Sequence, residues 1–184
     1  MRFTDKDRIE LLKIARETID ATLNHVKYSP LSETKILQAH CGSFVTLHKN
    51  GMLRGCTGRF NSDYELYKAV HDTAIQSAFQ DDRFPPVRID EMNEIDIEIS
   101  VLTPFRRITD VNDIEIGKHG IFMTKHGRSG TFLPQVATET GWSLMEFLGH
   151  CSQDKMGLGW NDWKDADIFT YEAEVFGEKE LNLK

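Results

Sequence analysis

The sequence predicts an α+β fold, with a mainly antiparallel sheet flanked by helices. Two observations support this prediction. Segments with apolar residues at helical spacing are mixed with hairpin signals, and the strand–helix–strand rhythm of a parallel sheet is missing. Residues 95–102 alternate strictly between apolar and polar side chains, which is typical of a half-buried strand.

Length and composition are those of one globular domain over residues 1–184. The 184 residues are 40% apolar and 28% charged, and no repeat or linker divides them. Apolar runs fall short of the ~18 residues that cross a bilayer, and the N-terminal sequence lacks the apolar core of a signal peptide. We therefore expect no membrane association and a cytoplasmic location. The net charge of −7 disfavours charge-driven binding of nucleic acid. Such binding would need a local basic patch.

The first helix is expected to begin at Thr4, which forms a capping box with Asp7 three residues later. It is expected to end before Tyr28-Ser29-Pro30, because proline disfavours helical geometry in the residue before it. Apolar residues recur at helical spacing between these limits, namely Ile9, Leu12, Ile19, Leu23 and Val26.

Residues 43–48 are expected to form a strand that turns at Asn50-Gly51, the strongest short hairpin signal, into residues 52–60. A two-residue loop places Cys56 opposite Val45. The same loop places Arg54 opposite Leu47, so that Arg54 and Cys56 share one face of the sheet.

Cys56 allows two interpretations, which spacing alone leaves open. In the first, Gly55 and Gly58 leave room for backbone or ligand, and Arg54 lowers the pKa of the thiol, which makes Cys56 a nucleophile. In the second, Cys56 is a small apolar residue buried among the valine and leucine side chains of the facing strand. A three-residue loop would reverse the face and weaken the first interpretation.

A second capping box, Ser62 with Glu65, is expected to begin the next helix. Its apolar stripe is Tyr67, Val70, Ala74 and Ala78. Pro85-Pro86 enforces extended chain beyond it. The intervening Asp81-Asp82-Arg83 is either a salt-bridged turn that stops the helix or a set of charges that positions a ligand or partner.

The second half of the chain is expected to alternate hairpins, short helices and strands. The expected elements are a hairpin over 120–133, a helix from Leu133-Pro134 to Gly141, a helix capped by Ser143 with Glu146 and running through Leu148 and Cys151, and a strand at 168–176. The hairpin turn is placed at Gly127 to Gly130, in preference to a phosphate-binding loop, because the sequence there has no P-loop pattern.

Neither a metal site nor a disulfide framework is expected. The three cysteines are widely spaced. Two adjacent pairs, His40-Cys41 and His150-Cys151, could supply zinc ligands, but they lack the usual ligand spacings. None of the seven histidines stands in a nucleophile motif. His71 falls in the helix after the cysteine strand, where it either serves Cys56 or is a solvated or packed helix residue.

Five motifs in order carry a resemblance to a known family. They are "LRGCTGRF", "AFQDDRFPPV", "IDIEISVLTPFRRI", "GKHGIFMTKHGRSGTFLPQVATETGW" and "WKDADIFTYEAEVF". Over nearly its whole length the chain resembles the AMMECR-domain family, in the form called AmmeMemoRadiSam system protein A. The resemblance implies two unequal lobes with a cleft between them, and a cysteine motif near that cleft. The family motif usually has isoleucine where this chain has Thr57, which on the expected register points away from Cys56.

The resemblance implies two partners, a Memo-type protein and a radical S-adenosylmethionine enzyme. This chain has no Cys-x-x-x-Cys-x-x-Cys motif for an iron–sulfur cluster, so any cluster belongs to a partner and no cofactor is expected here.

Our first functional hypothesis is an accessory or binding module that holds an anionic small molecule or a partner segment. Alternatives are an enzyme with Cys56 as nucleophile and a nucleic-acid-associated regulatory module. The expected binding residues are Leu53, Arg54, Gly55, Cys56, Thr57, Gly58, Arg59, Asp82, Arg83 and Arg128.

Overall fold

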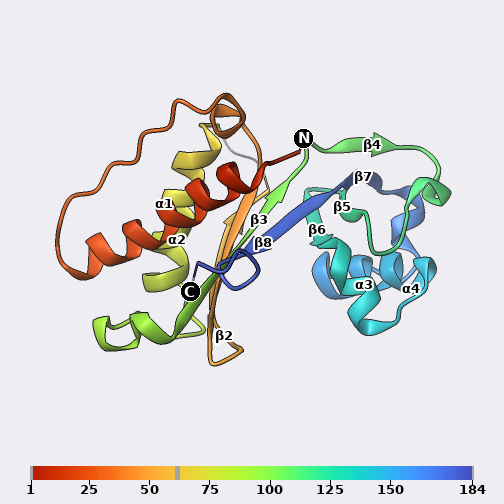
Figure 1. The fold of residues 1–184 in the computed structure, drawn as a ribbon. Helices are drawn as coiled ribbons and strands as arrows, with labels where there is room; N and C mark the ends of the chain where they lie inside the picture. Colours follow the sequence, from red (N-terminus) through yellow and green to blue (C-terminus); the bar gives the residue numbers. More distant parts are fainter. Residues whose placement is uncertain (1, 61–62, 184) are drawn as a thin grey trace. The chain divides into compact units, whose positions relative to one another are not determined.

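The strands form two four-stranded sheets, each accompanied by helices, which confirms the α+β class (Figure 1). The structure is a computed structural model in which residues 2–60 and 63–183 are described. The chain divides into two units. Unit 1 holds the chain up to Leu102 and again from Glu174, and unit 2 holds Thr103–Ala173.

The sheet of unit 1 has the strand order β2-β1-β3-β8, in which β1 pairs antiparallel with both β2 and β3. The edge strand β2 carries the cysteine motif. The elements of unit 1 are α1 (Asp5–Leu23), η1 (Lys35–Gln38), β1 (Ser43–Lys49), β2 (Met52–Arg59), α2 (Leu66–Phe79), η2 (Ile89–Glu94), β3 (Ile95–Leu102) and β8 (Ala173–Gly177).

Helices α1 and α2 lie side by side against one face of this sheet (Figure 1). Val45 and Leu47 of β1 and Ile97 of β3 are fully buried on that covered face. Because side chains alternate along a strand, Thr46 and His48 point to the opposite face, which we call the outer face. Both are half-buried.

The capping box of Thr4 and Asp7 begins α1 as predicted, with the Thr4 amide donating to Asp7 Oδ2 at 2.8 Å. The helix ends at Leu23, earlier than predicted, because His25 adopts a left-handed backbone with φ 57°. Val26 is therefore not part of the buried stripe and is 62% exposed.

Helix α2 begins at Leu66. The side chain of its N-cap residue, Glu65, makes no capping hydrogen bond. The predicted capping residue Ser62 lies outside the described residues. Within residues 2–60 and 63–183, no helix combines the length and hydrophobicity needed to cross a membrane.

The sheet of unit 2 has the order β4-β7-β5-β6, and its described pairings are antiparallel. The predicted cap of Ser143 by Glu146 is present. The elements of unit 2 are β4 (Arg106–Ile108), η3 (Val111–Asp113), β5 (Gly120–Lys125), β6 (Arg128–Phe132), α3 (Pro134–Thr140), α4 (Leu144–His150), the π-helical turn η4 (Cys151–Lys155), η5 (Asp162–Asp165) and β7 (Asp167–Tyr171).

Two expectations for unit 2 were wrong. The hairpin turns at His126-Gly127, whose φ angles are 52° and 75°, so residues 128–130 lie inside β6 and form no loop. The predicted strand at 168–176 is two strands, β7 and β8, in different sheets. The chain leaves the sheet of unit 2 at Glu172, whose amide donates to Thr103 Oγ1 at 2.8 Å instead of to a neighbouring strand.

Candidate functional site

A β-bulge in β2 decides where the cysteine points. The register of β1 and β2 shifts by one residue, since His48 pairs with Leu53 whereas Leu47 pairs with Gly55. Arg54 is the extra residue between those two pairs. Every side chain of β2 beyond Arg54 therefore lies on the face opposite to the one that an unbroken hairpin would give it.

Cys56 lies on the outer face, opposite Thr46, and not opposite Val45 as predicted. Thr46 Oγ1 donates a hydrogen bond to Cys56 Sγ at 3.3 Å. The thiol is half-buried, so the alternative of a cysteine packed into the covered core is also wrong.

The protein itself fills the space beside the two glycines of the motif. A Cβ on Gly55 would lie 2.2 Å from the backbone oxygen of Ser77 in α2. A Cβ on Gly58 would lie 2.4 Å from the ring of Phe44. Both glycines are needed for close packing of backbone and ring, so neither leaves room for a ligand on its own side.

Ser77 and Thr57 join α2 to the hairpin. Ser77 Oγ donates to the Val45 carbonyl at 2.7 Å and accepts from the Thr57 amide at 2.9 Å. Thr57 Oγ1 lies 2.8 Å from Ser77 Oγ and donates to the Thr73 carbonyl at 3.2 Å. Thr57 thus points away from Cys56, as predicted, and its hydroxyl bonds to α2.

A carboxylate and an arginine hold the backbone of Cys56. The Cys56 amide donates to Asp81 Oδ2 at 2.8 Å, and Arg83 Nη2 donates to the Cys56 carbonyl at 2.8 Å. Arg83 also donates to Asp81 from Nε at 2.9 Å and from Nη2 at 2.7 Å. The Arg83 guanidinium holds the pKa of the Asp81 carboxyl well below its usual range.

The arginine that interacts with Cys56 is therefore Arg83, and not Arg54 as predicted. Hydrogen bonding to Asp81 raises the pKa of Arg83, and the Cys56 side chain adds to this effect. The Arg83 side chain is 57% exposed. Asp81-Asp82-Arg83 is a salt-bridged turn, but one that also clamps β2.

Arg54 forms a separate ion pair on the helical turn η2. Its Nη2 donates to Glu91 Oε1 at 2.7 Å and its Nε to Glu91 Oε2 at 3.2 Å. Lys49 Nζ lies 3.2 Å from the same carboxylate. Hydrogen bonding to Arg54 is the main reason why the pKa of Glu91 falls to about 2. The charge of Arg54 is thus compensated within the protein.

The remaining predicted binding residues have different surroundings. Leu53 is 43% exposed and lies on the outer face with Cys56. Leu53 pairs with His48 and Cys56 pairs with Thr46. His48 and Thr46 are two residues apart on β1 and therefore point to the same face. The guanidinium of Arg59 lies 5.8 Å from the centre of the Tyr64 ring. Asp82 is exposed. Arg128 belongs to unit 2, where its Nη1 donates to the Gly157 carbonyl at 2.6 Å.

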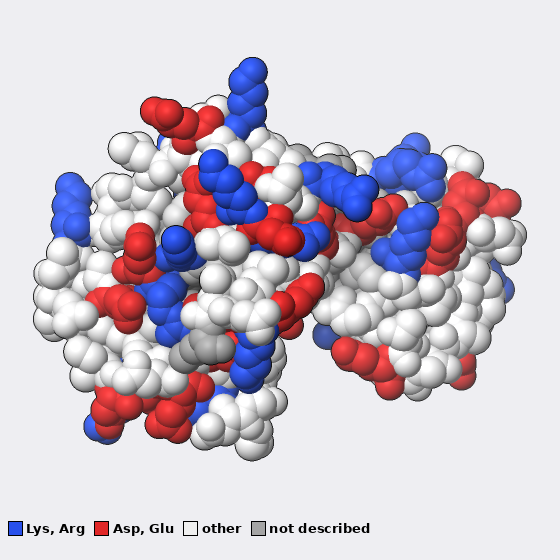
Figure 2. Space-filling model, in the orientation of Figure 1, with Lys and Arg blue, Asp and Glu red and all other residues white. Residues whose placement is uncertain are grey.

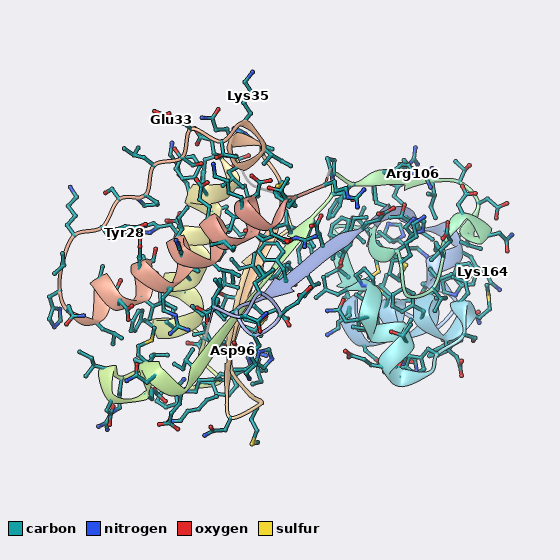
Figure 3. All side chains as sticks on the ribbon, in the orientation of Figure 1. Tyr28, Glu33, Lys35, Asp96, Arg106 and Lys164 are labelled. Carbon is teal, nitrogen blue, oxygen red and sulfur yellow. The ribbon has the colours of Figure 1, made fainter. Side chains whose placement is uncertain are left out.

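Pairing across the sheet places a histidine and a second carboxylate on the outer face with Cys56. His48 pairs with Leu53 on one side and with Asp96 of β3, which is labelled in Figure 3, on the other. Asp96 Oδ1 is buried and has no hydrogen-bond partner among the described residues. Cys56, His48 and Asp96 therefore share one face, although no hydrogen bond between Cys56 and a histidine is found in the described part of the chain.

Sequence reasoning missed four residues that build this site, namely Thr46, Ser77, Asp81 and Glu91. Ser77 had a usable signal, because it falls three residues after Ala74 on the buried stripe of α2, where a polar residue needs a partner. Asp81 belongs to the acidic pair of the predicted turn, but of that pair only the exposed Asp82 is among the expected binding residues. Only the folded chain brings Thr46 and Glu91 to the motif.

The other two cysteines are buried. Burial raises the pKa of the Cys41 thiol to about 11 and that of Cys151 to about 12. Within the described ranges, no group of three or more His, Cys, Asp or Glu side chains is placed to hold a metal ion.

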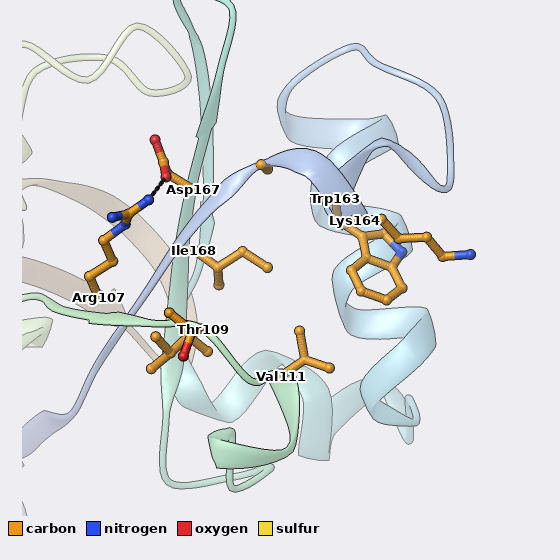
Figure 4. A pocket seen from close by; sticks show the side chains of 9 residues that line it. Arg107, Thr109, Val111, Trp163, Lys164, Asp167 and Ile168 are labelled. Carbon is orange, nitrogen blue, oxygen red and sulfur yellow. Dashed lines mark hydrogen bonds and ion pairs between the residues drawn. The ribbon is translucent and has the colours of Figure 1, made fainter.

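A separate pocket of about 220 Å³ lies in unit 2 (Figure 4). The ion pair of Arg107 and Asp167 lies at one side, and Trp163 and Lys164 lie at the other (Figure 4). Because Arg107 and Asp167 compensate each other, this ion pair adds no net charge to the pocket.

Comparison with known proteins identifies relatives along nearly the whole chain. The family model described as AMMECR1 matches residues 12–176. Protein Mbar_A1807 of Methanosarcina barkeri is 38% identical, over 96% of this chain and 93% of that protein. Protein MK0488 of Methanopyrus kandleri is 40% identical, over 92% of this chain and 87% of that protein. The crystal structure of uncharacterized protein PH0010 from Pyrococcus horikoshii is similar with a TM-score of 0.81, at 36% identity, and covers 92% of this chain and 90% of that one.

The close approach of α2 to Gly55 predicts the effect of a small substitution. Gly55→Ala is expected to lower the free energy of unfolding by about 2 kcal/mol or more, because its Cβ meets a helix carbonyl that cannot move alone. Gly177→Ala is the control: the nearest atom to its Cβ is 3.5 Å away, and we expect a change of about 0.5 kcal/mol. Urea denaturation measures both, and equal effects would contradict the proposed contact.

The Arg54–Glu91 pair predicts a pH dependence of stability. The pKa of Glu91 falls from 4.5 to about 2 on folding, so its contribution is present above pH 4.5 and is lost as the pH falls through about 2. Glu91→Gln should be less stable at pH 7, and its stability should fall less steeply between pH 4.5 and 2. Urea denaturation across this range is the measurement.

Glu94→Gln is the matched control, because the Glu94 side chain is 48% exposed. Asp81, whose pKa is also lowered, is present in all three proteins and contributes equally to each. A Glu91→Gln protein with the same pH slope as the wild type would contradict the assigned role of the pair.

Proposed function

Because this chain belongs to the AMMECR1 family, we propose that it is an accessory or binding component whose contact surface is the exposed edge strand β2, with side chains from both of its faces, and its clamp. We define this β2 surface as Met52, Leu53, Cys56 and Arg83. Met52 is 75% exposed, Leu53 is 43% exposed and the Arg83 side chain is 57% exposed. A surface with exposed apolar side chains and an arginine suits a protein partner, since such residues often dominate binding energy at interfaces.

The observation that favours binding over thiol catalysis is that the backbone amides of Cys56 and Thr57 are already hydrogen-bonded within the protein. The Cys56 amide donates to Asp81 and the Thr57 amide donates to Ser77. An acyl-transfer enzyme needs free donors near its nucleophile to stabilise an oxyanion, and both of these neighbouring donors are already used.

The proposed partner is a protein of the AmmeMemoRadiSam system, either the Memo-type protein or the radical S-adenosylmethionine enzyme. This proposal rests on the family resemblance together with the exposed apolar side chains of the β2 surface. A free anionic ligand is less well supported, because Arg54 is compensated by Glu91 and Arg83 is partly compensated by Asp81. Binding of nucleic acid has little support, since acidic and basic side chains are interspersed on the face drawn in Figure 2.

A charge placed on the β2 surface should weaken partner binding. Leu53→Asp is expected to lower the affinity for the Memo-type protein or the radical enzyme about tenfold or more, because it puts a carboxylate in an apolar contact. Val26→Asp is the matched control, since Val26 is a similarly exposed apolar residue of unit 1 outside the β2 surface. Calorimetry with each purified partner is the measurement, and circular dichroism checks the fold.

Either of two results would overturn this proposal. One is a folded Leu53→Asp protein with wild-type affinity. The other is a wild-type protein that binds neither partner at micromolar concentrations.

The second candidate function is an enzyme with Cys56 as nucleophile. It is favoured by the hydrogen bond that Thr46 donates to the thiol and by the positive charge of Arg83, which donates to the carbonyl of the same residue. His48 shares the outer face and is a better placed base than His71, which bonds to Thr18 of α1.

Labelling by iodoacetamide tests the thiol directly. In an enzyme of this kind, Cys56 should label faster near pH 7 than a free thiol, and Arg83→Ala should slow the reaction. Peptide mass spectrometry distinguishes Cys56 from Cys41 and Cys151, which should stay unlabelled because they are buried. A Cys56 that labels no faster than a free thiol would exclude this candidate.

A further inference from the structure

A pocket of about 450 Å³ opens in unit 1 on the side of α2 that does not contact β2. Its lining comes from the loop after α1, from the residues just before α2 and from α2 itself. The lining residues are Ser29, Pro30, Tyr64, Lys68, His71 and Asp72.

The spacing of α2 brings three of these side chains to one place. Lys68, His71 and Asp72 are related as i, i+3 and i+4, so they share one face of the helix. Ser77, which bonds to the hairpin, belongs to the buried stripe on the other side. The two faces of α2 therefore serve different surroundings, and the pocket is distinct from the β2 surface.

A buried threonine of α1 determines which nitrogen of His71 carries the proton. Thr18 is 1% exposed, and its Oγ1 donates its only proton to the Ile14 carbonyl at 2.6 Å. The same oxygen lies 2.8 Å from His71 Nδ1, so it must accept a hydrogen bond there. His71 Nδ1 is consequently the donor, and in the neutral ring Nε2 has a free lone pair.

The imidazole is held in place while Nε2 stays available. The Tyr28 ring lies 6.0 Å from the His71 ring at a tilt of 48°, and Figure 3 labels this tyrosine on the loop after α1. The Tyr28 hydroxyl donates to Glu17 at 2.8 Å. Nε2 has no hydrogen-bond partner among the described residues. His71 therefore presents a positioned acceptor at the wall of the pocket.

Besides His71, the pocket lining offers a second hydrogen-bond acceptor, the Asp72 carboxylate, whereas the charge of Lys68 is compensated. Asp72 accepts a hydrogen bond from the Tyr64 hydroxyl through Oδ2 at 2.8 Å, which leaves Oδ1 to accept from a ligand. Lys68 is paired with Glu65 at 2.9 Å, so its charge is compensated. Pro30 and the Tyr64 ring supply apolar surface beside these acceptors.

We propose that this pocket binds a small ring compound with N–H donors, and that His71 Nε2 accepts a hydrogen bond from it. The apolar wall takes the ring, and His71 and Asp72 take the donors. This site does not depend on the β2 surface or on a protein partner, so its failure would leave the proposed function untouched.

Nitrogen NMR of the full-length protein, labelled with ¹⁵N-histidine, tests both parts of the inference at pH 8. We expect His71 to be protonated at Nδ1 and unprotonated at Nε2. Three probes share one ring and differ in their polar group: benzamide, benzylamine and benzoate. Benzamide and benzylamine carry N–H donors and should shift the His71 Nε2 resonance, whereas benzoate has none and should not.

Substitutions at Thr18 test whether benzamide binding depends on the tautomer and orientation of His71. Thr18→Val removes the hydroxyl at nearly constant volume and is expected to weaken benzamide binding about tenfold, because Nδ1 loses its acceptor and the ring its orientation. Thr18→Ser keeps the hydroxyl and should retain the wild-type tautomer and affinity. Leu53→Asp should leave benzamide binding unchanged, because Leu53 lies on β2.

Three results would overturn the inference. The first is a wild-type His71 protonated at Nε2 and bare at Nδ1. The second is the lack of any Nε2 shift with millimolar benzamide and benzylamine. The third is an equal shift with benzoate, which would show that the pocket does not select for donors.

Discussion

The contact between the Ser77 backbone and Gly55 is the constraint on which unit 1 depends. The Ser77 carbonyl oxygen lies 2.2 Å from the place that a Gly55 Cβ would take, so only glycine lets α2 approach β2 so closely. At this distance Ser77 Oγ reaches between the strands, where it bonds to Val45 and Thr57. The same approach brings the residues after α2, including Asp81 and Arg83, to the edge of β2, so that one packing contact positions the clamp on Cys56.

The bulge at Arg54 is a second feature of β2 that determines the surroundings of Cys56. A single extra residue moves Cys56 from the covered face to the outer face, where its neighbours are Thr46 and Arg83. Arg54 itself pairs with Glu91, which satisfies its charge away from the thiol. The arginine adjacent in sequence is therefore structural, and the arginine near the thiol comes from a turn 27 residues away.

The two sides of helix α2 have different surroundings because they contact different elements. The side with Ser77 supports the β2 surface, which suits a protein partner. The side with His71 meets α1, where Thr18 fixes the ring so that Nε2 remains an acceptor. The proposed partner site on β2 and the proposed small-molecule pocket beside α2 can be separated by substitution, since Leu53 and Thr18 lie on different elements.

The sequence by itself determined the α+β class, the caps at Thr4 and Ser143, and the hairpin at Asn50-Gly51. These features depend on residues within a few positions of one another, so local patterns suffice. Only the tertiary structure decided the bulge at Arg54, the division of 168–176 into β7 and β8, and the choice of Asp81 over Asp82 as the buried carboxylate. Each of these depends on contacts between residues distant in sequence, and a one-residue shift in a strand reverses its faces while leaving the local pattern unchanged.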